Sequence, residues 1–490
     1  MTLNSSRDTN NASRNYHLVG VGGVGMSALA QLLLALGYQV SGSDRYHDQG
    51  RELDILKKLR SLGVKMVAQD GCGIKENTDA VVVSTAIEND NQDVAAARLK
   101  KIPVVHRAEM LASLAREKQC VAVTGTAGKS TVTGMIGWTL AELGLDPTVV
   151  NGAAVLNWVS GQNPGNFRFG RSNLWVLELD ESDRSLLNFY PEWAVVTNIS
   201  KDHFELAEVE KLFALFARQV KKDIIGPGFS EASPKASSAD THYDTLNRAV
   251  TKKPDFNPSL SQQGIEFYYK DIKFRLSLLG KHNAENALNC IMLCERLGLD
   301  LGMVSKALSK FAGIERRLEV AGRVCGITVI DDYAHSPAKI AAAWQAIAPF
   351  YHRIIAVWRP HGYGPLALMR RELMDVFARL VRPEDRIVIM SVYFAGGTAE
   401  KKVTARMLAE DMEQNNLPVN YVENYDELLA LLLKSAADGD AVLLMGARDP
   451  DLPVFVRGLV LKFNDFIMNR MPGAGGITQK DKPAEKAEGD

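Results

Sequence analysis

Short apolar runs alternate with longer amphipathic stretches along most of this chain. In the N-terminal part the apolar runs at residues 16–20, 39–43, 80–84 and 102–105 predict strands, and residues 26–36 predict a helix. Buried strands that alternate with helices are typical of a parallel sheet with crossover connections. The hydrophobic pattern therefore predicts an α/β fold for this part of the chain.

The same alternation continues in two further α/β units. The second unit begins with a strand at Val121, and the third begins near Val324. Further strands are predicted at residues 174–179, 194–198, 327–330, 354–357, 387–390 and 441–445, and a helix at 283–297. Residues 226–263 are rich in Ser, Pro, Asp and Thr, which predicts an extended loop or mobile insertion.

Length and composition narrow the class of protein. A chain of 490 residues is too long for one hydrophobic core. The net charge of −1 argues against a general nucleic-acid or membrane-surface binder. The polar first fifteen residues lack the apolar core of a signal peptide, so we expect a cytoplasmic enzyme. The five cysteines show no metal-binding spacing, and Cys290 and Cys294 are expected to be buried thiols on one helix face.

A glycine-rich turn follows the first predicted strand. The segment from Gly20 to Gly25 contains G-x-G-x-x-G, which lets the backbone approach a pyrophosphate at the start of a helix. Asp44 ends the next strand, where a dinucleotide-binding fold places its ribose-binding acid. A nicotinamide dehydrogenase, a UDP-sugar site and a packing turn without ligand all remain compatible with this motif.

A phosphate loop opens the second unit. Residues 121–131 run from an apolar strand through Gly125 and Gly128 into a predicted helix. Loop amides and Lys129 would meet phosphate oxygens, and the Ser130 hydroxyl would bind Mg²⁺. Val123 stands where the longer form of the motif has its first glycine. The flanking strand and helix argue against a plain surface turn and favour an ATP site, which a hydride-transfer enzyme does not explain.

Ten segments together resemble the Mur ligase family in order and spacing. They are VGVGGVGMSALAQLL (19–33), SGSD (41–44), STAI (84–87), RAEML (107–111), VTGTAGKST (123–131), ELDESD (178–183), TNISKDH (197–203), GKHNAEN (280–286), DDYAHSP (331–337) and RPHGY (359–363). The resemblance covers nearly the whole chain and is nearest to the branch that adds L-alanine to UDP-N-acetylmuramate.

This resemblance implies an α/β protein of three domains. They are a Rossmann-like UDP-sugar-binding domain (15–112), a central ATP-binding domain of the P-loop ATPase type (113–320) and a Rossmann-like C-terminal domain (321–470), followed by a disordered tail (471–490). The implied activity is that of an ATP-dependent ligase of peptidoglycan synthesis. It would join an amino acid, with L-alanine expected first, to UDP-N-acetylmuramate through an acyl phosphate, with ATP and Mg²⁺ and without a nucleic-acid or membrane partner.

The resemblance also implies the site residues. Those expected to bind the UDP-sugar are Gly22, Gly23, Val24, Gly25, Asp44, Ser84, Thr85 and Arg107. Those expected to bind ATP are Gly125, Thr126, Gly128, Lys129, Ser130, Thr131, His282, Asn283, Asn286, Asp332 and His335. The expected catalytic residues are Lys129, Glu178, His203 and Arg317, with Ser130, Glu178 and His203 as metal ligands. The amino acid is expected to meet Arg359, His361 and Tyr363.

Three segments depart from the pattern of the alanine-adding branch. Ala127 stands where that branch has histidine, DDYAHSP leans towards relatives that add diaminopimelate or lysine, and RPHGYGP lacks the usual basic residues. Two further hypotheses therefore stay open. One is a muropeptide-recycling ligase that adds a peptide to UDP-N-acetylmuramate, and the other is a catalytically impaired, nucleotide-binding paralogue.

Overall fold

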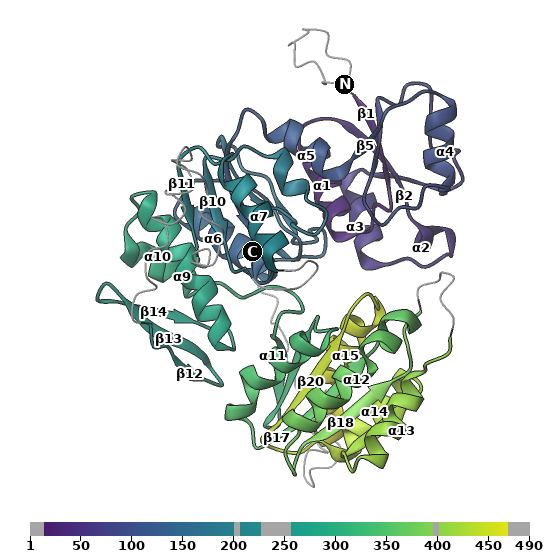
Figure 1. The fold of residues 1–490 in the computed structure, drawn as a ribbon, viewed down its shortest axis with the longest axis vertical. Helices are drawn as coiled ribbons and strands as arrows, with labels where there is room; N and C mark the ends of the chain where they lie inside the picture. The colour runs from purple at the N-terminus through teal and green to yellow at the C-terminus, as the bar shows by residue number, and fades with distance from the viewer. Residues whose placement is uncertain (1–13, 200–205, 227–255, 395–400, 469–490) are drawn as a thin grey trace, which may run out of the picture. The chain divides into compact units, whose positions relative to one another are not determined.

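The computed structural model describes residues 14–199, 206–226, 256–394 and 401–468 (Figure 1). The chain divides into two compact units, Met1–Glu315 and Arg316–Asp490, and each is described by itself. Both units are built on parallel sheets with helices between consecutive strands, as the hydrophobic pattern predicts.

The first sheet of unit 1 has five parallel strands in the order β3-β2-β1-β4-β5. Its elements are β1 (Asn15–Val19), α1 (Val24–Ala35), β2 (Gln39–Ser43), α2 (Arg45–Asp48), α3 (Asp54–Leu62), β3 (Lys65–Val67), β4 (Ala80–Val83), α4 (Gln92–Leu99), β5 (Val104–His106) and α5 (Arg107–Ala115). Leu18 and Val19, neighbours on β1, are both fully buried. Burial on both faces is expected of a parallel sheet covered by helices and explains why its strands read as continuous apolar runs.

The second sheet of unit 1 has six strands in the order β11-β10-β6-β9-β7-β8, in which only β8 runs antiparallel to its neighbour. Its elements are β6 (Gln119–Thr124), α6 (Lys129–Glu142), β7 (Thr148–Val150), η1 (Leu156–Trp158), β8 (Phe167–Arg168), β9 (Leu174–Glu178), η2 (Ser185–Asn188), β10 (Trp193–Val196), α7 (Leu206–Ala217) and β11 (Asp223–Ile225). One continuous apolar cluster joins both sheets, including Leu29 of α1 and Trp175 of β9.

The described part of unit 1 also contains a small antiparallel ribbon and two helices. They are β12 (Ser259–Ser261), β13 (Gly264–Tyr269), β14 (Ile272–Leu276), α9 (Lys281–Arg296) and α10 (Leu301–Leu308). β12 lies inside residues 226–263, so the prediction that this whole stretch is an irregular loop is wrong for its end; residues 227–255 lie outside the described part. Cys290 and Cys294 are buried in α9, which confirms their reading as core thiols.

Unit 2 has one six-stranded sheet in the order β15-β16-β20-β17-β18-β19, and only β15 is antiparallel. Its elements are β15 (Glu319–Val324), β16 (Ile327–Asp332), α11 (Pro337–Ile347), η3 (Ala348–Phe350), β17 (Arg353–Arg359), α12 (Tyr363–Leu380), β18 (Arg386–Met390), α13 (Ala405–Gln414), β19 (Val419–Val422), α14 (Tyr425–Ser435), β20 (Asp440–Gly446) and α15 (Asp451–Met468). β15 begins at Glu319 and ends at Val324, so the sheet starts before the position near Val324 where the hydrophobic pattern places the third α/β unit.

The exact domain boundaries remain a prediction, because the division into two units groups the first two expected domains together. The expected disordered tail, residues 471–490, lies outside the described residues. In the part of the chain that the structure describes, no helix is both long and apolar enough to cross a membrane.

Candidate functional site

The glycine-rich turn lies at the carboxyl edge of the first sheet. Gly20 has a φ of +71°, and the amides of Gly20 and Val21 donate to the carbonyl of Ser43. The amide of Gly22 donates to the Asp44 carboxylate over 3.0 Å. A Cβ on Gly22 would lie 2.9 Å from the same carboxylate, so a side chain there would displace it. Asp44 therefore holds the turn in place, and its predicted contact with the UDP-sugar remains a prediction.

Other residues predicted to bind the UDP-sugar gather at the same edge. Ser84 and Thr85 directly follow β4, and Arg107 directly follows β5. The Arg107 side chain lies against Gly25, because a Cβ on that glycine would be 3.1 Å from the guanidinium carbon. The carboxyl ends of parallel strands share one edge of a sheet, which is where such folds bind nucleotides.

The phosphate loop connects β6 to α6 and contains two glycines with positive φ, Gly125 (+129°) and Gly128 (+82°). A Cβ on Gly125 would lie 2.2 Å from the Thr197 hydroxyl, and a Cβ on Gly128 would lie 2.6 Å from the Asn286 amide oxygen. Both positions thus require glycine. The loop leads the chain into the first turn of α6, where Lys129, Ser130 and Thr131 present backbone amides without intrahelical partners. Such a helix start suits a phosphate group.

Asn198, which follows β10, fixes the tip of this loop. Its side-chain oxygen accepts from the Ala127 amide (3.0 Å), and its side-chain amide donates to the Ala127 carbonyl (2.9 Å). The Thr126 hydroxyl donates to the same Asn198 oxygen. Asn198 therefore fixes the loop through the Ala127 backbone and the Thr126 hydroxyl. These bonds do not depend on which side chain stands at position 127.

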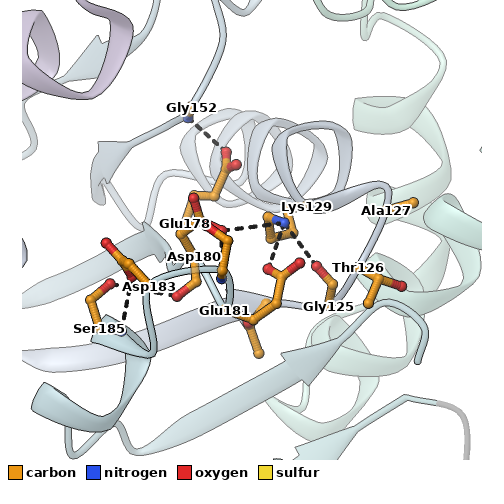
Figure 2. A network of polar contacts seen from close by, with 12 residues as sticks. Gly125, Thr126, Ala127, Lys129, Gly152, Glu178, Asp180, Glu181, Asp183 and Ser185 are labelled. Carbon is orange, nitrogen blue, oxygen red and sulfur yellow. Dashed lines mark hydrogen bonds and ion pairs between the residues drawn. The ribbon is translucent and has the colours of Figure 1, made fainter. Parts of the chain in front are cut away.

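The Ser130 hydroxyl donates to Glu178 Oε1 over 3.1 Å. Glu178 ends β9, beside the strand that leads into the loop, and its other oxygen accepts from the Gly152 amide over 2.6 Å (Figure 2). A Cβ on Gly152 would come within 2.5 Å of the carboxylate, so this glycine allows the backbone to approach. Two oxygen-bearing side chains are thereby held together at the start of α6.

Lys129 is held by acidic side chains (Figure 2). Its ammonium lies 2.7 Å from Glu181 Oε2, 3.9 Å from Asp180 Oδ1 and 2.9 Å from the Gly125 carbonyl. Burial alone would lower the pKa of Lys129, but the carboxylates of Glu181 and Asp180 outweigh burial and raise it. Burial raises the pKa of Glu181, whose side chain is 2% exposed. The pair is a buried cation and anion in direct contact.

The oxygen donors of Ser130 and Glu178 fit the hard-ligand preference of Mg²⁺. Lys129 and the α6 amides fit a nucleotide phosphate. No group of three His, Cys, Asp or Glu side chains is placed to hold a metal ion in residues 14–199, 206–226, 256–394 and 401–468. His203, the third predicted ligand, lies outside these residues. Among the described residues, Ser130 and Glu178 are therefore the predicted ligands that the structure brings together.

The residues predicted to meet adenine lie at the start of α9. Asn283 donates to the Leu279 carbonyl (2.8 Å) and accepts from the Asn286 side chain (3.1 Å), so its amide is already bonded within the helix start. The N-cap of α9 is Gly280, so Asn283 lies inside the first turn of the helix. His282 is exposed, whereas Asn286 lies against Gly128 of the phosphate loop.

In unit 2, three residues predicted to act in ATP binding or catalysis lie around Tyr333. They are Arg317, Asp332 and His335. Asp332 accepts from the amides of Leu318 and Ala334 (2.8 Å each), and burial raises its pKa. Arg317 is exposed, and its guanidinium carbon lies 5.5 Å from the centre of the Tyr333 ring. His335 Nδ1 contacts the Tyr333 carbonyl over 2.9 Å. The roles predicted for these residues in ATP binding remain predictions.

Of the residues predicted to meet the amino acid, Arg359 ends β17 and the other two follow it. Arg359 Nε lies 2.9 Å from Asp449 Oδ2, and its guanidinium carbon lies 4.8 Å from the centre of the Tyr425 ring. His361 packs against His335 with ring centres 5.3 Å apart, and burial, with smaller effects from His335 and Arg448, lowers its pKa to about 4.

Tyr363 begins α12, and its ring packs against that of Phe394 with centres 5.5 Å apart. His335 and His361 are thus brought together at the carboxyl edge of the unit 2 sheet, whereas Tyr363 packs on the residues that follow β18.

Several partners of these residues were not assigned from the sequence. They are Gly152, Asn166, Glu181, Asn198, Tyr425 and Asp449. Glu181 and Asn198 belong to recognisable motifs, and Asp449 follows an apolar strand. The sequence could therefore have indicated these three residues as candidates. Their partners lie 52, 71 and 90 residues away, respectively, and only the fold identifies them.

Comparisons with known proteins agree on one family. Residues 15–119 match the Mur ligase family catalytic domain, 123–294 the Mur ligase middle domain and 316–448 the Mur ligase glutamate ligase domain. The chain is 35% identical over 448 residues to UDP-N-acetylmuramate–L-alanine ligase of Myxococcus xanthus, covering 88% of this chain and 92% of that protein. It is also 35% identical over 461 residues to the protein of that name from Polaromonas sp., with 89% and 96% covered.

Solved structures show the same architecture. The UDP-N-acetylmuramate-alanine ligase of Thermotoga maritima matches with a TM-score of 0.74 and 26% identity, covering 92% of this chain and 99% of that one. A murein peptide ligase of Psychrobacter arcticus shares the fold, with a TM-score of 0.62 and 20% identity over 92% of this chain and 99% of that one. Three matching domains in the expected order, together with full-length relatives, show that this chain belongs to the Mur ligase family.

Proposed function

We propose that this protein is an ATP-dependent ligase that joins L-alanine to the carboxylate of UDP-N-acetylmuramate in peptidoglycan synthesis. The observation that carries the proposal is the cluster of Lys129, Ser130 and Glu178 at the end of the phosphate loop. The names of relatives that are 35% identical over most of the chain support the choice of substrates. No comparable observation favours a nicotinamide dehydrogenase.

A carboxylate is a poor electrophile, and phosphorylation gives it a leaving group. ATP supplies the phosphoryl group, and Mg²⁺ neutralises the charge on its oxygens. The carboxylate oxygen forms a bond to phosphorus as ADP leaves. The amino nitrogen of L-alanine then bonds to the acyl carbon, and inorganic phosphate departs with the former carboxylate oxygen.

Within this chain, the phosphate loop would contribute positioning and charge. The first-turn amides of α6 and the Lys129 ammonium would face phosphate oxygens, while Ser130 and Glu178 would hold Mg²⁺. The bond from the Gly152 amide fixes the Glu178 carboxylate, so its position does not depend on a flexible side chain alone. Preorganised charge of this kind is the largest contribution a protein can make to phosphoryl transfer.

Arg359 is our candidate for binding the carboxylate of L-alanine. Asp449 lies beside its Nε, and the guanidinium carries four further N–H donors that suit a carboxylate. His361, with a pKa of about 4, is neutral at physiological pH and adds no charge beside Arg359. A neutral imidazole can donate or accept one hydrogen bond, which suits a zwitterionic amino acid.

The proposal is tested by measuring phosphate release from ATP in the presence of UDP-N-acetylmuramate and one amine at a time. L-alanine, glycine, L-serine and the cell-wall tripeptide are the amines. Release that depends on both the sugar nucleotide and L-alanine is expected. Release with the tripeptide alone would identify a muropeptide-recycling ligase, and ATP binding without release with any amine would identify an impaired paralogue.

A further inference from the structure

Asn166 connects the second sheet of unit 1 to helix α1 through a buried, hydrogen-bonded side chain. The residue immediately precedes β8 and is 3% exposed. Its amide nitrogen donates to the Val24 carbonyl (2.8 Å) and to the Ser27 hydroxyl (2.9 Å), both in α1. Its amide oxygen accepts from Gln31, one turn further along α1 (3.0 Å). Both amide hydrogens and the amide oxygen of this side chain thus bond to the helix that starts at the glycine-rich turn.

The backbone of Asn166 leads towards Glu178. Its carbonyl accepts from the Asn151 amide over 3.0 Å, which extends the pairing of β7 with β8 by one residue. The next residue, Gly152, donates its amide to Glu178 Oε2 over 2.6 Å. Glu178 Oε1 in turn accepts from Ser130. A continuous series of hydrogen bonds and short backbone segments therefore runs from Val24 to the start of α6.

The two ends of this series are the two predicted ligand sites of unit 1. Val24 belongs to the turn expected to bind the UDP-sugar, and Glu178 is the expected Mg²⁺ ligand beside the nucleotide phosphates. Buried, hydrogen-bonded polar groups are costly to separate. When one partner moves, the other is therefore expected to move with it, more than it would across a contact filled with solvent. Gly152 has no side chain, so its backbone lies directly against the Glu178 carboxylate. A movement of this backbone is therefore expected to displace the carboxylate.

We propose that Asn166 is a positioning residue that couples UDP-sugar binding at the glycine-rich turn to nucleotide binding at Glu178 and Ser130. This inference rests on the proposed function, since it takes both ligands from there. When the sugar nucleotide orders the turn, Asn166 holds the 151–152 segment and hence Glu178 in the arrangement that binds the metal–nucleotide complex. Coupling of this kind is reciprocal, so the nucleotide tightens sugar binding by the same factor.

The test measures the dissociation constant of the imido analogue of ATP, with Mg²⁺, in the absence and presence of saturating UDP-N-acetylmuramate. For the unaltered protein we expect the sugar nucleotide to tighten analogue binding by a factor of about five or more. For Asn166→Ala we expect that ratio to fall to about one. Ser27→Ala, which removes only one acceptor of the Asn166 amide, is expected to give an intermediate ratio and guards against a poorly folded Asn166 variant.

Gln31→Met is the matched control. It removes a buried bond to Asn166 in the same interface but leaves the link from Asn166 to Val24 intact. We expect Gln31→Met to lower the melting temperature about as much as Asn166→Ala does, and to keep the coupling ratio of the unaltered protein. A purely structural role of Asn166 would lower the melting temperature while leaving the ratio unchanged.

The outcomes separate the inference from the proposed function. An unchanged ratio in Asn166→Ala and Ser27→Ala, or a ratio of one in the unaltered protein, would overturn the inference and leave the proposed function standing. Failure of the unaltered protein to bind either ligand would overturn the proposed function and the inference together. Loss of coupling in Gln31→Met as well would assign the effect to the interface as a whole and overturn the role of Asn166.

Discussion

Lys129 in unit 1 and Arg359 in unit 2 are both cations near the carboxyl end of a parallel strand, and each is held by a buried acid. Lys129 contacts Glu181 through a flexible side chain, with Asp180 further away. Arg359 is held by Asp449 and also lies over the ring of Tyr425. A lysine held by an acid and one backbone carbonyl can turn towards a phosphate, whereas a planar guanidinium that is also stacked on an aromatic ring stays in place. We therefore infer that Lys129 moves when ligand binds and that Arg359 is preorganised.

Lys129→Ala is expected to have the largest effect. Removing a positive charge that would face a reacting phosphate costs about a hundredfold or more in kcat. Binding of UDP-N-acetylmuramate, measured by calorimetry, is expected to stay close to that of the unaltered protein. Lys129→Arg is the control that keeps the charge. Loss of turnover and sugar binding together in Lys129→Ala would show that the two sites are not separable.

Arg359→Lys tests the preorganised side of the comparison. Lysine keeps the charge but loses the planar fork and the stacking on Tyr425, so the KM for L-alanine is expected to rise about tenfold. The KM for ATP is expected to change little. Arg370→Lys is the matched control, because that arginine pairs with Asp411 on helix α13. An unchanged KM for L-alanine would remove Arg359 from the amino-acid site.

Glu181→Gln tests the movable side of the comparison. The lysine no longer has to leave a carboxylate when it meets a phosphate, so the ATP analogue is expected to bind about fivefold more tightly. Asp180→Asn removes the more distant acid, 3.9 Å from the ammonium, and is expected to have a smaller effect. Weaker analogue binding in Glu181→Gln would mean that Glu181 positions Lys129 for the phosphate instead of competing with it.

The smallest effect is expected from Asp331, a buried acid of unit 2, and it concerns the stability of the fold. Burial, only partly offset by Arg316, raises the pKa of Asp331 to about 7. Because this folded-state pKa lies above the unfolded one, the folded form holds its proton longer, and stability is lost as pH rises from about 4 to about 7. Asp331→Asn lacks this titration. Its melting temperature relative to the unaltered protein is expected to be higher at pH 8 than at pH 5, and an equal difference at both would contradict the assignment.

The strands that line the two sites were predictable because each is a continuous apolar run buried on both faces. The prediction at residues 39–43 coincides with β2, and those at 80–84 and 174–179 differ from β4 and β9 by one residue. The ribbon of β12, β13 and β14 was missed because an antiparallel strand with one wet face gives a weaker signal. Phe267 in β13 is 2% exposed, for example, and its neighbour Tyr268 is 65% exposed.

The site residues, too, divide into those that the sequence predicts and those that it does not. Phosphate loops and glycine turns are local, so their sequence predicted their position. The contacts of Lys129 with Glu181, of Ala127 with Asn198 and of Val24 with Asn166 join distant segments. Nothing in the local sequence specifies such pairs, because they are set by how strands order in the sheet and how the first sheet packs on the second.

The central claim is that the carboxylate of UDP-N-acetylmuramate is phosphorylated before the amide bond forms. It is tested most directly with UDP-N-acetylmuramate carrying oxygen-18 in that carboxylate, together with ATP, Mg²⁺ and L-alanine. Transfer of one labelled oxygen to inorganic phosphate per amide bond formed is predicted, since the phosphate departs with a carboxylate oxygen. Unlabelled phosphate, with no amide product, would mean that water attacks ATP and would contradict the account.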